Sequence, residues 1–195
     1  IVKGKESQEK LLEGINGTAD VVKTTLGTKG RTVLIQEKYG LGFNITKDGV
    51  TVANSISLDE EYLNIGSDFI KNAAKKTVDE AGDGTTTTSI LTQSMCNNIF
   101  KELELGKNQN ELIKDLKEAD RDIKNSVKPV QLNIGQKEAL LDLFFNVGAK
   151  KLSNSKLVTH IKNKNFDEAT SEINFISSNH KIFAGLCQRR IEDID

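Results

Sequence analysis

The sequence predicts a mainly α-helical fold that contains one small β-hairpin region. Most of the 195 residues lie in windows where apolar residues recur at spacings of three and four. Residues 32–52 differ, because they are rich in β-branched and turn-forming residues. The composition, with 36% hydrophobic and 28% charged residues, is typical of a globular protein.

The first helix is predicted over residues 7–26, and Gly27 is expected to end it. Its apolar stripe consists of Leu12, Ile15, Ala19, Val22 and Leu26. A short β-rich run follows at 32–35. Residues 44–46 and 50–52 are predicted to be two strands joined by the tight turn at 47–49, since Asp-Gly is a strong hairpin signal.

Three long helices are predicted after this region. The first covers about 59–80 and ends in the breaker at 81–84. Its apolar face is expected to contain Tyr62, Ile65, Phe69, Ala73 and Ala74. The second begins after 85–88 and carries Leu91, Met95, Ile99 and Leu103 at spacings of four. The third covers about 108–124.

A domain boundary is predicted between residues 128 and 129, because 125–133 contain Pro129 and little periodicity. Beyond it, a helix is expected over 136–147, capped by Asn133 and Gly148. Shorter helices are expected over 155–162 and 166–175, and a last one from near residue 184.

Charge and hydropathy narrow the choice of partners. The net charge of −1 gives no indication of nucleic-acid binding, although a basic patch can be hidden in a neutral total. No apolar run is long enough to span a bilayer, so we expect no membrane partner and a cytoplasmic location, in a host cell or a virion. Cys96 and Cys187 form no metal-binding motif and are expected to be core residues.

A phosphate-binding loop is the chemistry that the residues themselves indicate. In the string Gly82 to Thr87, glycines permit close backbone approach, and the following helix would present its N–H groups to an anion. Asp83 in such a loop suggests a bridging Mg²⁺. A glycine-rich stretch at 26–30 and the turn pair Lys47–Asp48 are two further candidate segments.

Residues 3–128 resemble the N-terminal segment of a group I chaperonin. The resemblance rests on four strings in order, at 11–16, 25–31, 45–53 and 81–87. It implies an α-helical equatorial domain that binds ATP and forms contacts between subunits. One departure is Thr28, where the family usually has proline.

By this resemblance, each candidate segment has a role in nucleotide binding. Thr25, Leu26 and Gly27 would line the nucleotide, with Lys47 beside it. Asp83 would hold Mg²⁺, and the segment from Gly84 through Thr85 and Thr86 to Thr87 would donate to the phosphates. Asp48 would orient the attacking water and is the single catalytic candidate.

Residues 131–195 resemble the C-terminal part of phage-type lysozymes, the muramidases of endolysins. The strings that carry this resemblance are 136–149, 153–157, 165–169 and 185–192. Muramidase chemistry needs a carboxylic acid beside the glycosidic bond. The family's acid lies in a part that has no counterpart here.

Both resemblances are incomplete, so the function expected from the sequence is a non-catalytic structural or assembly protein of phage derivation. We expect it to pack against copies of itself or against partner chains. Two alternatives stay open. One is an ATP- and Mg²⁺-binding chaperonin-like protein that assists folding, and the other is a peptidoglycan-degrading muramidase.

Overall fold

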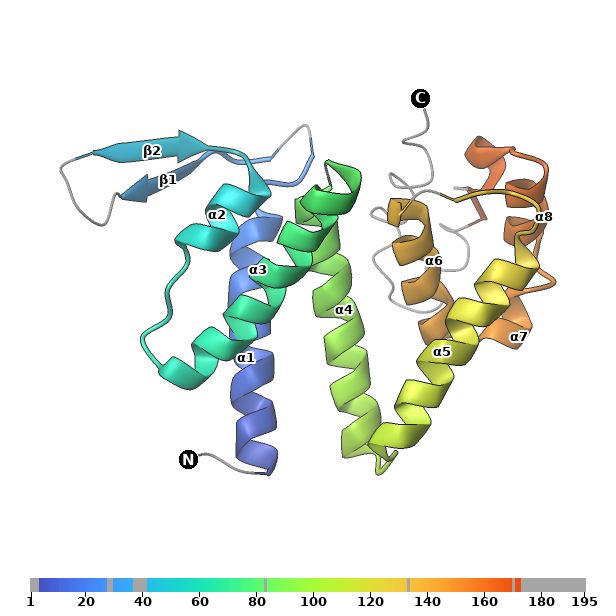
Figure 1. Ribbon diagram of the computed structural model, residues 1–195, viewed down its shortest axis with the longest axis horizontal. Helices are drawn as coiled ribbons and strands as arrows, with labels where there is room; N and C mark the ends of the chain where they lie inside the picture. Colours follow the sequence, from blue (N-terminus) through green and yellow to red (C-terminus); the bar gives the residue numbers. More distant parts are fainter. Residues whose placement is uncertain are drawn as a thin grey trace. The chain divides into compact units, whose positions relative to one another are not determined.

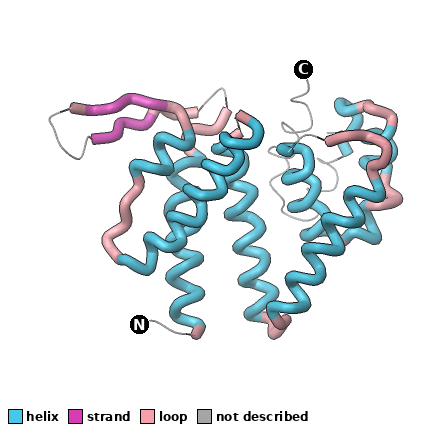
Figure 2. The backbone as a smooth tube through the Cα atoms, in the orientation of Figure 1, coloured by secondary structure: helices cyan, strands magenta, loops and turns pink. Residues whose placement is uncertain are grey.

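The computed structural model describes residues 4–27, 30–36, 42–82, 84–132, 134–169 and 171–172. The chain divides into two compact units, Ile1–Phe100 and Lys101–Asp195. Its elements in order are α1 (Lys5–Lys23), β1 (Val33–Gln36), β2 (Phe43–Thr46), α2 (Gly49–Ser55), α3 (Glu61–Ala81), α4 (Thr85–Glu104), α5 (Gln109–Ser126), α6 (Ile134–Val147), α7 (Ala149–Leu152) and α8 (Lys156–Lys162). The mainly helical fold with a small hairpin is therefore confirmed (Figures 1 and 2).

Two glycines let α1 and α3 approach each other closely. A Cβ placed on Gly14 would lie 2.0 Å from the carbonyl oxygen of Leu63, and one on Gly66 would lie 2.2 Å from that of Leu11. Beside this crossing, Ile15, Ala19 and Ile70 form a buried apolar cluster. The backbones of the two helices thus meet without intervening side chains, which fixes their separation.

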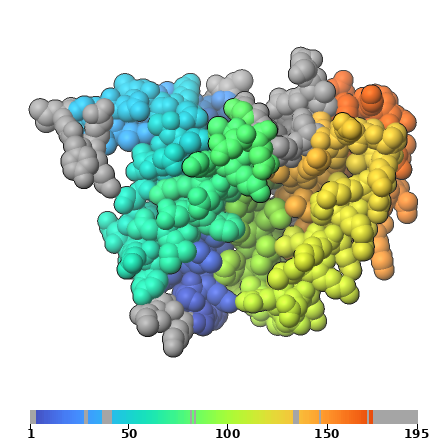
Figure 3. Space-filling view, in the orientation of Figure 1, coloured from blue at the N-terminus to red at the C-terminus, as the bar shows by residue number. Residues whose placement is uncertain are grey.

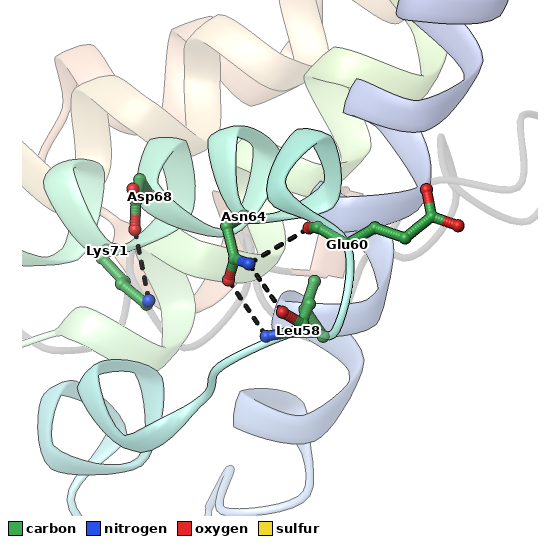
Figure 4. Close-up of polar contacts among 5 residues, drawn as sticks. All are labelled: Leu58, Glu60, Asn64, Asp68 and Lys71. Carbon is green, nitrogen blue, oxygen red and sulfur yellow. Dashed lines mark hydrogen bonds and ion pairs between the residues drawn. The ribbon is translucent and has the colours of Figure 1, made fainter.

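The first turn of α3 is held by a side chain rather than by a conventional cap. The Asn64 amide accepts from the backbone N–H of Leu58 at 3.0 Å and donates to the carbonyl oxygens of Leu58 (2.6 Å) and Glu60 (3.1 Å). One turn further on, Lys71 pairs with Asp68 (Figure 4). The three Asn64 bonds tie the loop before α3 to the first turn of this helix.

The prediction that residues 44–46 pair with 50–52 through the Asp-Gly turn is wrong. The strand partner of 43–46 is 33–36, in an antiparallel register that places Leu34 opposite Ile45. Residues 50–52, predicted as a strand, belong to α2 because the Asp48 side chain caps this helix. Val52 and Ala53 are then buried with Val22, so tertiary packing overrides the β propensity of the Val-Thr-Val run.

The predicted apolar face of α3 is also wrong, because it is largely the exposed face. Ile65 is 57% exposed and Phe69 52%, while Ala74 is the fully buried member of that set. The residues of α3 that are buried are Gly66, Ser67, Ile70, Ala74 and Thr77. In Figure 3, residues 61–81 form a teal-to-green surface band, as this exposure requires.

In the second unit, α5 begins with a reciprocal capping box between Asn108 and Glu111. The buried apolar side chains of this unit are Leu112, Ala119, Ile123, Val127, Leu132, Ala139, Leu140, Leu143, Phe144, Leu152, Leu157, Val158, Ile161 and Ala169. The helices predicted at 136–147 and 155–162 are confirmed as α6 and α8, with Gly148 following α6 at φ 95°.

Other sequence predictions fall partly outside the described residues. Of the helix predicted over 166–175, residues 166–169 and 171–172 are helical, and Asn133 and the helix expected near 184 lie outside the description. The boundary predicted at 128–129 lies inside the second unit and stays a prediction. Of the helices that the structure describes, none has the length and hydropathy needed to cross a membrane.

Candidate functional site

Three segments far apart in the sequence meet at one end of the first unit. The hydroxyl oxygens of Thr25, after α1, and Thr86, in the first turn of α4, are 3.3 Å apart. A Cβ on Gly49, the first residue of α2, would lie 2.3 Å from the Thr86 hydroxyl and 3.1 Å from that of Thr85. The structure therefore brings together the three candidate segments that the sequence indicated.

The hydrogen-bond directions at Thr25 and Thr86 can be assigned. The Thr25 hydroxyl donates its one proton to the carbonyl oxygen of Val22 at 2.7 Å. The Thr86 hydroxyl must then donate to Thr25 across the 3.3 Å contact. Thr25 is buried, so this contact ties the end of α1 to the start of α4.

The loop after α1 folds back on itself. Gly27 has φ 73°, a left-handed conformation that favours glycine. The backbone N–H of Gly30 donates to the carbonyl of Gly27 at 2.8 Å, and that of Arg31 donates to Thr24 at 2.8 Å. Leu26 is half-buried beside Gly27, which is exposed. Thr28 lies outside the described residues.

Asp48 caps α2 and is held as a carboxylate. Its Oδ2 accepts from the Thr51 hydroxyl at 2.6 Å and from the Thr51 backbone N–H at 2.8 Å. The side-chain hydrogen bond from Thr51, assisted by the backbone N–H groups of Thr51 and Val50, lowers the pKa of Asp48 against a smaller opposing effect of burial. The neighbouring Lys47 is exposed.

The start of α4 has the donors that a phosphate group needs. Gly84 has φ 95°, and the bond from the Thr88 N–H to the Gly84 carbonyl at 3.0 Å opens the helix. The N–H groups of residues 85–87 precede that bond, so the helix offers them no i−4 acceptor. With the hydroxyls of Thr85 and Thr87, this donor set fits an anion at the positive end of a 20-residue helix.

The predicted metal ligand, Asp83, lies outside the described residues. Within the described part of the chain, no group of three His, Cys, Asp or Glu side chains could hold a metal ion. The residues that the structure places here are therefore donors to an anion, plus one carboxylate, Asp48.

A polar cluster between α1 and α4 supports the site, and the sequence analysis missed it. The Gln93 amide nitrogen donates to Asn16 at 3.1 Å and to Asp20 at 2.9 Å, and the Asn97 amide nitrogen donates to Asn16 at 2.8 Å. The i, i+4 spacing within each pair, 16 with 20 and 93 with 97, was the available signal.

A second link joins α3 to the start of α4. The Thr77 hydroxyl lies 3.0 Å from that of Thr88, and both side chains are buried. Thr77 also lies within hydrogen-bonding distance of the Ala73 carbonyl at 3.2 Å. The first turn of α4 is thus held from two sides.

The TCP-1/cpn60 chaperonin family matches residues 18–170, more than half of the chain and all three segments of the site. This chain belongs to that family. The chaperonin resemblance of residues 3–128 is confirmed within the matched range. The match also continues past the predicted boundary at 128–129, into the segment that the sequence analysis compared with lysozyme.

The solved structures that resemble this chaperonin-family chain include two crystal forms of the chaperonin gp146 from bacteriophage EL 2 (Pseudomonas aeruginosa), both in the presence of ATP-BeFx. One is 25% identical, with a TM-score of 0.57, over 79% of this chain and 29% of that one. The other is 25% identical, with a TM-score of 0.56, over 77% of this chain and 29% of that one. The chain thus spans less than a third of the phage chaperonin's length.

The comparisons give no support to the lysozyme resemblance of residues 131–195. Through residue 170, they assign the same stretch to the chaperonin family. Residues 173–195, which include one of the strings that carried the lysozyme resemblance, lie outside the described residues.

Proposed function

We propose that this chain binds Mg²⁺-ATP at the meeting point of α1, α2 and α4, as the nucleotide-binding part of a chaperonin. The observation that carries the proposal is the convergence of Thr25, Gly49 and Thr86, with the Thr25 and Thr86 hydroxyls 3.3 Å apart across 61 positions of sequence. Local turn chemistry alone would not bring these segments together.

Each part of the site has a role under this proposal. The N–H groups of Thr85, Thr86 and Thr87 and the hydroxyls of Thr85 and Thr87 would donate to phosphate oxygens, helped by the positive end of the α4 dipole. Residues 25–27 would line the nucleotide, with Lys47 beside it. Asp83 would hold Mg²⁺, which supplies positive charge to the phosphates.

Asp48 is the residue that we propose for hydrolysis. Its lowered pKa keeps it a carboxylate at neutral pH, which is the form able to orient an attacking water. The assignment is supported by the neighbouring Gly49, whose Cβ position would lie 2.3 Å from the Thr86 hydroxyl in the first turn of α4.

The similar solved structures support the proposal of nucleotide binding and suggest a wider chaperonin activity. The phage chaperonin gp146 was crystallised in the presence of ATP-BeFx, an ATP analogue. Assisted folding and assembly with copies of the chain are proposals that extend beyond the matched 29% of that protein. The competing proposal is a structural or assembly role without nucleotide. In that role the glycine-rich segment 82–87 would be part of the fold and would bind no ligand.

Isothermal titration calorimetry with Mg²⁺-ATP tests the proposal. We expect saturable binding by the wild type and a loss of at least tenfold in affinity for the double variant Thr86→Val, Thr87→Val, because it removes the Thr87 donor to phosphate and the Thr86–Thr25 bond that holds the start of α4. Thr159→Val, an exposed threonine on α8, is the matched control and should bind as the wild type does.

Circular dichroism on each variant separates a lost site from a lost fold. A folded wild-type sample that gives no heat with Mg²⁺-ATP would leave the structural role as the better proposal. Clearing of a peptidoglycan suspension by the same sample would instead favour the muramidase alternative.

A further inference from the structure

A segment of the second unit carries one sign of charge in an otherwise balanced chain. From Leu143 to Phe166 there is no Asp or Glu, although the whole chain has 28 acidic and 27 basic residues. The same stretch contains the lysines 150, 151, 156, 162 and 164, and all five are exposed. We call these five the lysine cluster.

The fold holds the lysine cluster on a short helical segment. Lys150 and Lys151 belong to α7, Lys156 begins α8, and Lys162 ends it. Since a helix rises about 1.5 Å per residue, the seven residues of α8 span only about 10 Å. Figure 3 shows parts of this segment, in orange, at the surface.

Buried apolar side chains fix which side of this segment faces water. Leu152, Leu157, Val158 and Ile161 are each no more than 2% exposed. Ser155 caps α8 by accepting from the Val158 N–H, and the Ser153 hydroxyl bonds back to Ala149. The lysines are thus presented by an ordered scaffold, which reduces the entropy lost when they bind a partner.

Several lysines elsewhere in the described chain are paired with acids, whereas no member of this cluster is. Lys107 pairs with Asp115, Lys124 with Asp120 and Lys71 with Asp68. No ion pair found among the described residues involves a member of the cluster. Within the described part of the chain its charges therefore have no acidic partner, and the acidic pair Asp167–Glu168 bounds the segment.

The chemistry of the cluster favours one class of partner. Insertion into a membrane surface is disfavoured, because the apolar residues of α7 and α8 are buried. A protein partner of ordinary affinity would need an apolar centre inside the charged rim, which is absent from this segment for the same reason. Five exposed lysines within residues 150–164, with no acid among them, match a regular polyanion.

We propose that residues 150–164 bind the phosphate backbone of nucleic acid without regard to sequence. This activity is separate from the proposed nucleotide site, because the two lie in different units of the chain. Five phosphate contacts predict a slope of about −4.5 for log K against log salt concentration on duplex DNA. Affinity should then fall on the order of several hundredfold between 50 and 200 mM salt.

Fluorescence anisotropy with a labelled 20-base-pair duplex tests the proposal across that salt range. The variant with Lys150, Lys151, Lys156, Lys162 and Lys164 all changed to Gln should lose more than tenfold in affinity at 50 mM salt, together with most of the salt slope. The matched control changes five exposed lysines elsewhere, Lys5, Lys75, Lys76, Lys114 and Lys117, to Gln. It alters the net charge equally and should bind within about threefold of the wild type.

Equal losses in the two five-lysine variants would overturn the proposal, because they would assign binding to net charge alone. No anisotropy change for the wild type at 50 mM salt would overturn it as well. Preferred binding to vesicles of phosphatidylglycerol, with none to DNA, would assign the cluster to a membrane instead. At constant free Mg²⁺ and constant ionic strength, Mg²⁺-ATP at a concentration that saturates the nucleotide site should not displace the duplex, which separates this test from that of the nucleotide site.

Discussion

At the residue scale, Asp48 links local structure to the proposed chemistry. Its carboxylate caps α2 through Thr51, and the same bonds lower its pKa. A dipeptide that usually marks a hairpin turn here marks a helix start, because Asp accepts from an N–H three residues ahead. The cap and the proposed catalytic role thus depend on the same ionised group.

Removing this cap should destabilise the first unit. Asp48→Ala is expected to lower the free energy of unfolding by about 1 kcal/mol at pH 7, and Asp48→Asn by less, because Asn also caps helices well. Urea denaturation followed by circular dichroism measures both. An Ala variant as stable as the wild type would mean that the cap contributes nothing in solution.

The stability difference between the wild type and Asp48→Asn should depend on pH in one direction. The folded pKa of Asp48 is below its ordinary value of 3.8, so the ionised form is favoured by folding. The charge-dependent stabilisation is therefore present above the ordinary value and lost as the pH falls through the folded pKa. Denaturation at pH 7, 5, 4 and 3 should show the difference shrinking only below about pH 4.

Burial should make the Cys96 thiol unreactive. Desolvation raises its pKa to about 11, so at pH 8 about one molecule in a thousand carries the thiolate. In a Cys187→Ser background, Cys96 should react with a thiol reagent such as DTNB at least tenfold more slowly in native buffer than in urea. Equal rates would show that α1 and α4 open readily around it.

At the element scale, contact between backbones explains why the core face of α3 was mistaken. Periodicity identified the stripe of large apolar residues, including Ile65 and Phe69, but these are more than half exposed. The face that packs on α1 is built on Gly66 and Ser67, which have little hydropathy signal. Only small residues fit there, because α1 and α3 approach each other too closely for larger side chains.

Alanine substitutions at three glycines test this packing. Gly14→Ala and Gly66→Ala should each cost about 1–3 kcal/mol of stability, because the new methyl group would overlap a backbone carbonyl that cannot move aside cheaply. Gly17→Ala is the control on the same helix, since no atom lies within 4 Å of its Cβ position. It should stabilise by about 0.5–1 kcal/mol through helix propensity. Thermal denaturation ranks the three variants.

At the scale of the whole molecule, the hairpin of the first unit presents three strongly exposed apolar side chains. Leu34, Phe43 and Ile45 are 61%, 60% and 68% exposed, and the strand register places them on one face. The opposite face carries Val33 and Ile35, which pack against the cluster around Val22. A hairpin that is apolar on both faces is typical of a surface that a partner covers.

We therefore expect self-association that depends on this face. Sedimentation velocity should show concentration-dependent oligomers for the wild type, reduced in the double variant Phe43→Ser, Ile45→Thr. Leu105→Ser, at the 74% exposed residue of the turn after α4, is the control for a general loss of apolar surface. A wild type that stays monomeric at high micromolar concentration would contradict the expected oligomer.

The sequence by itself determined the longer helices, the candidate segments and the chaperonin resemblance of residues 3–128. Helix periodicity, the capping residues around Asn108 and Gly82, and the order of the glycine-rich strings are properties of neighbouring residues. The resemblance carried by those strings indicated Thr25, Gly84 and Thr86 as site residues, whereas Gly49 and the polar cluster around Gln93 were not predicted. Their roles in binding nucleotide remain proposals for the titrations to test.

Only the tertiary structure decided which faces are buried and which strands pair. The strand 43–46 pairs with the preceding strand 33–36 rather than with 50–52. Residues 50–52 are helical instead, and Val52 and Ala53 are buried against α1. The glycine contact of α1 with α3, and the link from Thr25 to Thr86, join residues that are distant in sequence. Such contacts depend on how closely backbones approach in space, which periodicity along a single helix does not encode.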